Sequence, residues 1–207
     1  MLAMNAGMIN VLGLISLLHQ SVSHMTGNAS LIALSLADQD YSSVIFLVLV
    51  VISYVLGSSY SGFILGNSHF QLARRYGLPL TLVTIFILLC WLFINEYPRY
   101  ALLWACASMG IQNAMVSHYQ GAIIRTTHLS GVLTDLGLAL GYFFRGLKND
   151  PKKIILHLLI LIGFITGSIV AAISYPYLQL NAFLIPAGLS FLLSLIYWIL
   201  YLRHSRI

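Results

Sequence analysis

Two short polar stretches carry residue types that can bind a solute or move a proton. One is Ser23-His24-Met25-Thr26-Gly27-Asn28, and the other is Thr127-His128-Leu129-Ser130-Gly131 in the second half of the chain. An imidazole titrates near neutral pH, and hydroxyl groups both donate and accept hydrogen bonds. Each stretch lies between apolar runs. A polar break that recurs at matching places in two apolar halves is typical of a membrane protein built from a repeated unit, with the breaks meeting near the bilayer midplane.

Composition places the whole chain in the membrane. Of its 207 residues, 59% are hydrophobic and 7% are charged, against roughly 25% charged residues in a soluble domain. We therefore predict an all-α polytopic membrane protein with a single transmembrane domain over residues 1–207, whose main partner is the lipid bilayer. The net charge of +5 does not indicate a nucleic-acid partner, because the basic residues cluster in loops, as membrane orientation requires.

The apolar runs predict six spanning helices and two short helices that follow the breaks. A spanning helix needs roughly 20 apolar residues. The long runs are 1–20, 41–66, 78–94, 100–116, 154–175 and 182–202, and the short ones are 28–37 and 129–144. The two halves, about 1–97 and 98–207, thus share one order of elements. They also share small and polar residues, which we pair as follows: Gly7 and Asn10 with Gly110 and Asn113, and Gly57 and Gly62 with Gly163 and Gly167.

Basic loop residues favour six crossings with both short helices re-entrant. Eight basic residues then share one side, against Arg99 on the other, and these eight are Arg74, Arg75, Arg145, Lys148, Lys152, Lys153, Arg203 and Arg206. Eight crossings would give a seven-to-two split, which the positive-inside rule favours less. Six crossings place both termini in the cytoplasm. Three crossings per half is an odd number, so we predict a 3+3 inverted repeat.

The breaks predict a binding site for a small anionic or polar solute. Gly27 and Gly131 allow unusual backbone conformations, and Thr26, Asn28 and Ser130 are natural N-cap residues for the short helices. Unpaired amide groups at the N-termini of these helices attract negative charge. The predicted substrate-binding residues comprise both breaks and their neighbours: Asn10, Ser23, His24, Thr26, Gly27, Asn28, Asn113, Arg125, Thr127, His128, Ser130, Gly131 and Asp135.

Each of these residues also has a purely structural interpretation. The serines, threonines and glycines can simply satisfy the backbone and pack tightly at a helix break. His24 and His128 can be buried imidazoles bonded to a carbonyl group. Arg125 either adds a fixed positive charge to the site or marks a helix end by extending to the head groups.

Asp135 is an acid inside an apolar segment, which indicates function because burying an acid in a membrane is costly. It follows His128 by about two helical turns, so the two side chains can share a face. A proton relay or a cation-coupling acid is one interpretation. A salt bridge with Arg125, or stabilisation by the helix dipole, is the other. The matching position in the first half is Leu31, so this acid is not part of the repeat.

Enzyme and metal signatures are missing from the sequence. The histidines form no i, i+4 pair with a nearby acid, and Cys90 and Cys106 lie inside apolar runs. We find no nucleophile–base arrangement, phosphate loop or dinucleotide fingerprint. We therefore expect no metal, no cofactor and no enzymatic activity. Small residues around Gly57, Gly62 and Gly66 allow a homodimer, although packing within one chain would use the same residues.

Several motifs resemble those of the YoaK-type family of bacterial inner-membrane proteins. They are Ala6-Gly7-Met8-Ile9-Asn10, Val22 to Asn28, Met109 to Ala114, Arg125 to Gly131 and Leu133-Thr134-Asp135-Leu136-Gly137. The resemblance covers nearly the whole chain and implies a multipass protein of the bacterial inner membrane whose activity is not established. It implies no catalytic residues. The usual family pattern has an acid near position 10, where this chain has Asn10.

The sequence thus supports two functional hypotheses. The first is a secondary transporter or channel that holds a small solute between the two short helices. The second is a non-transporting sensor, scaffold or assembly partner in the membrane. A solvent-reachable cavity at the breaks favours the first hypothesis, and a dry, tightly packed midplane favours the second.

Overall fold

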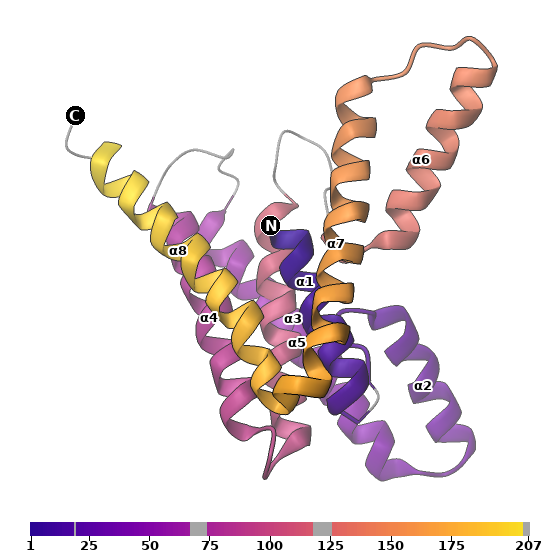
Figure 1. Cartoon of the computed structure of the whole chain (residues 1–207). Helices are drawn as coiled ribbons and strands as arrows, with labels where there is room; N and C mark the ends of the chain where they lie inside the picture. Colours follow the sequence, from indigo (N-terminus) through magenta and orange to yellow (C-terminus); the bar gives the residue numbers. More distant parts are fainter. Residues whose placement is uncertain (19, 67–73, 118–125, 205–207) are drawn as a thin grey trace.

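Helices form the regular structure of the chain in a computed structural model, which describes residues 1–18, 20–66, 74–117 and 126–204 (Figure 1). In chain order the elements are α1 (Leu2–Ser16), α2 (Met25–Ala37), α3 (Tyr41–Leu65), α4 (Arg74–Phe93), α5 (Pro98–Val116), α6 (Leu129–Phe144), α7 (Pro151–Leu178), the 3₁₀ helix η2 (Gln179–Phe183) and α8 (Leu184–His204). No strand occurs in these ranges. The all-α class predicted from composition is confirmed for them.

Three stretches of the described chain are long and apolar enough to cross a membrane: Tyr41–Leu65, Tyr76–Phe93 and Pro151–Arg203. The last contains α7, η2 and α8 without a break. These stretches are fewer than the six spanning helices that the apolar runs predict. One reason is that the chain leaves the first helix at Ser16, before its apolar run ends at about residue 20. The two short helices are present, with 13 residues in α2 and 16 in α6.

Helices from one half of the chain pack against helices from the other half. Helix α1 packs along α7, and α5 packs along α3, so each half lays its first helix on a long helix of the other. Both pairs approach closely at glycines, where an added Cβ atom would overlap a backbone carbonyl of the partner helix. The glycines are Gly7, Gly57, Gly110 and Gly167, which face Phe164, Ala107, Tyr54 and Met4 respectively.

This packing corrects one of the predicted glycine pairings. Gly57 and Gly167 play the same role, since each lies against the first helix of the other half. Gly62 has nothing within 4 Å of an added Cβ atom, and Gly163 meets the Ala3 side chain at 3.4 Å. The sequence spacing misaligned these glycines because it could not show which of them face a neighbouring helix. Gly57 packs within the monomer, so it is not available for a dimer contact.

The main hydrophobic core fixes the first break. It contains the fully buried side chains of Leu12 in α1, Leu102 in α5 and Phe183 in η2. Leu17 and Val22, which flank the first break, belong to the same cluster and have no exposed surface. The chain between α1 and α2 is therefore held by apolar contacts on both sides of its polar residues.

Helices α2 and α6 lie at one edge of the molecule. In Figure 1 they follow each other along the right side, with α6 beside the upper part of α7 and α2 near the lower end of α3. Among the described elements, α2 packs mainly on α3 and α6 mainly on α7. Each short helix therefore has much of its surface uncovered, and their N-terminal ends face the middle of the molecule.

Candidate functional site

Both short helices begin at a histidine. His24 is the N-cap of α2 and His128 is the N-cap of α6, with nearly the same backbone angles (φ −92° and ψ 72°, φ −93° and ψ 62°). Neither imidazole accepts a capping hydrogen bond from its own helix. The first amide groups of each helix therefore lack a side-chain cap, which leaves a partial positive charge at both N-termini.

The residues expected as caps lie two to four positions after the observed N-caps, inside the helices. Thr26, Asn28 and Ser130 are helical residues, so their predicted N-cap role is wrong. Asn28 is buried, and its Nδ2 donates to the Ser21 carbonyl at 3.3 Å, which ties α2 back to the break. Thr26 and Ser130 are exposed at the start of their helices. Composition identified the right residue types, but the cap position depends on where each helix begins.

Gly27 and Gly131 have a different role from the predicted one. Neither is among the residues with positive φ, so the backbone does not require glycine there. Each lies three residues after a histidine, where an added Cβ would meet the imidazole at 3.7 Å in α2 and at 3.6 Å in α6. These are ordinary contact distances. Glycine therefore leaves room beside each imidazole ring in the first helical turn.

One cavity of about 350 Å³ joins the two breaks. Its lining residues are Asn10, Ser23, His24, Met25, Thr26, Tyr54, Thr127, His128, Leu129, Ser130 and Phe164. The residues from the two breaks occupy matching positions: serine with threonine, histidine with histidine, Met25 with Leu129, and threonine with serine. Long helices α3 and α7 add one aromatic ring each. Among the described residues that line this cavity, none is acidic.

Two asparagines attach the breaks to the preceding helices. Asn10 Oδ1 accepts hydrogen bonds from Ser21 Oγ at 2.8 Å and from Ser23 Oγ at 3.1 Å. In the second half, Asn113 Nδ2 donates to Thr127 Oγ1 at 2.6 Å and to the Tyr54 hydroxyl at 2.8 Å. Asn10 lines the cavity, whereas Asn113 is 3% exposed and acts behind it. Sequence reasoning placed both near the site, and the structure assigns Asn113 to holding Thr127 and Tyr54.

Among the described residues, a network of buried amide side chains backs the second break. Asn5 Nδ2 donates to Gln112 Oε1 at 3.0 Å, and Gln112 Nε2 donates to Thr126 Oγ1 at 3.1 Å. Thr126 Oγ1 then donates to Asn113 Oδ1 at 2.9 Å. Asn5, Gln112 and Thr126 were not among the predicted substrate-binding residues, although the sequence offers Gln112, with Asn10 and Asn113, as an amide donor and acceptor from the helices before the breaks. A signal was present, because Gln112 and Asn113 are consecutive amides inside an apolar helix, where each needs a partner.

Asp135 lies away from the cavity. Its Oδ2 is 3.3 Å from Nε2 of His157 on α7, and the two side chains are 56% and 20% exposed. It does not line the cavity with His128, although the two are on one helix. Neither predicted role for Asp135 included His157, because only the packing of α6 on α7 brings them together. Arg125 lies outside the described residues.

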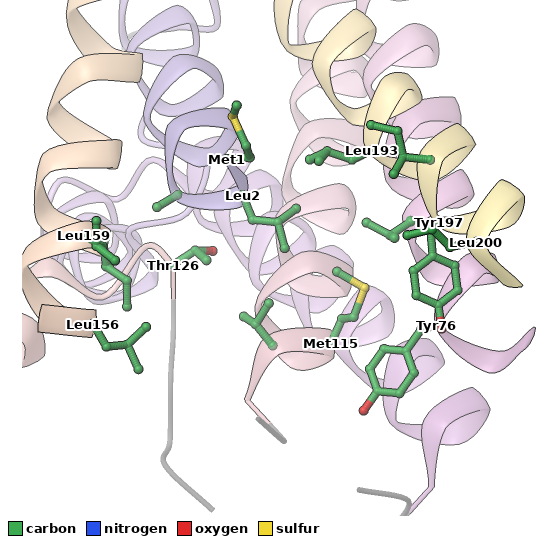
Figure 2. Close-up of a pocket in the computed structure, with 15 residues that line it drawn as sticks. Met1, Leu2, Tyr76, Met115, Thr126, Leu156, Leu159, Leu193, Tyr197 and Leu200 are labelled. Atoms are coloured by element: carbon green, nitrogen blue, oxygen red, sulfur yellow. The ribbon is translucent and has the colours of Figure 1, made fainter. Parts of the chain in front are cut away.

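A second cavity of about 480 Å³ lies between the ends of α1, α4, α5, α7 and α8 (Figure 2). Apolar side chains such as Leu2, Met115, Leu159 and Leu193 line it. Thr126 borders this cavity, and the next residue, Thr127, lines the cavity at the breaks. Sequence reasoning did not predict this space. Because its lining is apolar, this cavity does not offer a stable binding site to a charged solute.

Comparison with known proteins agrees with the resemblance noted in the motifs. The transmembrane protein YoaK of Bacillus subtilis (strain 168) is 26% identical to this chain over 184 residues, which cover 85% of this chain and 82% of YoaK. No solved structure matches the fold. A family described as "Protein of unknown function (DUF1275)" matches residues 1–196. The chain therefore belongs to the DUF1275 family, which includes transmembrane proteins and has no assigned activity.

Proposed function

We propose that this protein is a secondary transporter or channel for a small anionic or polar solute. The observation that carries the proposal is the single cavity of about 350 Å³ lined by both polar breaks. A cavity at two half-helix N-termini is the arrangement in which membrane transporters bind their solutes. The solute would lie between His24 and His128, within reach of the hydroxyls of Thr26, Thr127 and Ser130.

The lining favours a small anion or an uncharged polar molecule over a cation. Two helix N-termini attract negative charge, and the lining described above contains no acidic side chain to neutralise a cation. Hydroxyl groups and the Asn10 amide provide donors for oxygen atoms of the solute. Met25, Leu129 and Phe164 limit its size and can contact a short apolar part.

The same cavity supports a 3+3 inverted repeat with six crossings and two re-entrant helices. In such a repeat each half presents the same surfaces to the other, which agrees with α1 packing on α7 and α5 packing on α3. Two hydrogen bonds show the same correspondence between the halves. Ser58 Oγ on α3 donates to the Gly110 carbonyl on α5 at 3.1 Å, and Ser168 Oγ on α7 donates to the Gly7 carbonyl on α1 at 3.4 Å. Both termini would lie in the cytoplasm of a bacterial cell, with the protein in the inner membrane.

Rocking of one half against the other would carry the solute across. The glycine contacts of α1 with α7 and of α3 with α5 allow close sliding of smooth helix surfaces. Thr126 and Thr127 separate the solute cavity from the apolar cavity of Figure 2. That apolar cavity would act as a hydrophobic gate, because a polar solute enters it only when it widens and fills with water.

A membrane sensor or assembly partner remains the alternative function. If that alternative holds, the polar residues of the breaks should be buried and hydrogen bonded within the protein. Asn28 and Asn113 fit it, because both are buried and hydrogen bonded. His24 and His128 do not, since both are exposed at the cavity. The exposed imidazoles favour a solute.

Liposomes containing the purified protein test the proposal. Osmotic swelling would report uncharged solutes such as glycerol, and currents on a solid-supported membrane would report anions such as chloride, acetate and lactate. We expect at least one solute to cross faster than in protein-free liposomes. His24→Ala and Ser130→Ala should reduce its uptake by about tenfold, which corresponds to roughly 1.4 kcal/mol of lost binding.

Ser30→Ala is the matched control, since Ser30 is exposed on α2 one turn beyond the cavity and donates only to the Thr26 carbonyl. It should leave uptake unchanged. If His24→Ala and Ser130→Ala transport every solute as the wild type does, the assignment of the site is wrong.

A further inference from the structure

The apolar cavity of Figure 2 reaches from the outer surface of the molecule to its interior. Figure 1 shows α7 and α8 diverging from their connection at η2, and side chains of both helices line the cavity. Those at its outer edge are exposed, with Leu159 at 62% and Leu200 at 46%. Those at its inner end, such as Ala3 on α1 and Met115 on α5, are buried. The cavity is therefore open to the medium that surrounds the protein.

The lining and the volume of this cavity fit one acyl chain. Apart from Thr126 and the tyrosines Tyr76 and Tyr197, the lining side chains are aliphatic or methionine. Apolar cavities in proteins stay dry and take up apolar molecules. A methylene group is about as large as a water molecule, which takes about 30 Å³ in the liquid, so 480 Å³ holds about 16 methylene groups. That number corresponds to a single lipid chain.

Basic side chains lie at one end of this cavity. Lys152 precedes the lining residue Leu156 by about one turn of α7, and Arg203 follows the lining residue Leu200 by about one turn of α8. Residues at this spacing share a helix face. Both basic side chains are exposed, as is that of Lys153. The neighbouring acid, Asp150, caps α7 by accepting a hydrogen bond from the Lys152 backbone N–H at 3.0 Å.

We propose that this cavity binds one acyl chain of an anionic phospholipid, with the phosphate group near the basic residues at the ends of α7 and α8. Basic pockets between transmembrane helices bind anionic head groups. A zwitterionic phospholipid carries a cation beside its phosphate, so it gains less from the same residues. The lipid site does not depend on the proposed transport function. If that function holds, the bound chain also keeps polar solute out of the cavity while the gate is closed.

A photoreactive lipid tests the site in liposomes. The full chain would be reconstituted with phosphatidylglycerol that carries a diazirine on its acyl chain, irradiated, and mapped by peptide mass spectrometry. We expect adducts on Met115, which is 5% exposed and lies at the inner end of the cavity, out of reach of the lipid around the protein. Adducts confined to exposed residues outside the cavity, such as Leu192 and Ile199, would overturn the proposal.

The same label on phosphatidylcholine tests the role of charge. It should give about fivefold fewer adducts on Met115, because each basic residue favours an anionic head group. Lys152→Glu combined with Lys153→Glu should remove this preference. Arg145→Glu combined with Lys148→Glu is the matched control, since it changes the net charge equally at exposed positions that do not line the cavity. Equal labelling of the wild type by both lipids would refute an anionic ligand.

Filling the cavity provides a further measurement. Leu193→Trp should lower the labelling of Met115, whereas Leu192→Trp, at the adjacent exposed position outside the cavity, should not. Leu200→Trp, at the exposed outer edge, fills the same space if Leu193→Trp does not fold. Unchanged labelling in the folded filled variants would contradict the site. Absent labelling of Met115 with solute flux intact would refute the lipid site alone, and labelling without flux would refute the transport function alone.

Discussion

Gly57→Ala should destabilise the protein because it forces α3 and α5 apart. The new Cβ atom would overlap the backbone carbonyl of Ala107, and backbone cannot move aside as a flexible side chain can. Overpacking of this kind costs about 1–3 kcal/mol. Separation of the helices also weakens two interhelical hydrogen bonds, from Ser53 Oγ to the Leu103 carbonyl at 2.7 Å and from Ser58 Oγ to that of Gly110.

The magnitude follows from these terms. Each interhelical hydrogen bond in a membrane is worth about 0.6 kcal/mol. Alanine in a helix regains about 1 kcal/mol of helix propensity over glycine. The net loss in the free energy of unfolding should therefore be about 2 kcal/mol, or roughly 4–8 °C in melting temperature for a chain of this size.

Gly62→Ala on the same helix is the matched control. Nothing lies within 4 Å of its Cβ position, so only the propensity gain of up to about 1 kcal/mol applies and the melting temperature should stay equal or rise. A thiol-reactive dye can follow both variants in detergent, because Cys90 and Cys106 are buried and react when the fold opens. Melting temperatures within about 2 °C of each other would refute the packing argument for Gly57.

Three further predictions follow from local geometry. Gly27→Ala and Gly131→Ala should melt no lower than the wild type, because their Cβ atoms make ordinary contacts with the imidazoles; a fall of several degrees would contradict this. The Asp40 carboxylate accepts a hydrogen bond from the Ser43 backbone N–H at 3.2 Å. Hydrogen bonds from the Ser43 side chain and backbone hold the pKa of Asp40 below its ordinary value of 3.8. Its stabilisation of α3 is thus present above pH 3.8 and lost as the pH falls through the lowered pKa, so melting temperatures of wild type and Asp40→Asn should differ at neutral pH and converge in acid. Asp38→Cys and Leu147→Cys should label from opposite membrane faces with an impermeant maleimide, and labelling from one face would rule out re-entrant short helices.

The helix order and the two breaks were predictable because both leave local signals in sequence. Apolar runs interrupted by polar residues set the order of the helices, and α6 begins and ends at its predicted residues, 129 and 144. Histidine, hydroxyl and glycine residues at matching places marked the two breaks, and residues from both line one cavity. Family membership was also readable from these motifs.

Composition by itself determined that this chain is a helical membrane protein, since so few charged residues cannot cover a surface in water. Tertiary structure decided which residues meet. The partner of Asp135 is His157 on the next helix, and Gly57 corresponds to Gly167 because both lie against a helix from the other half. Such contacts join residues far apart in the chain, and the period of a helix does not encode them. Hydropathy marks where helices lie in the bilayer, but side-chain shape and hydrogen bonding between helices determine which faces touch.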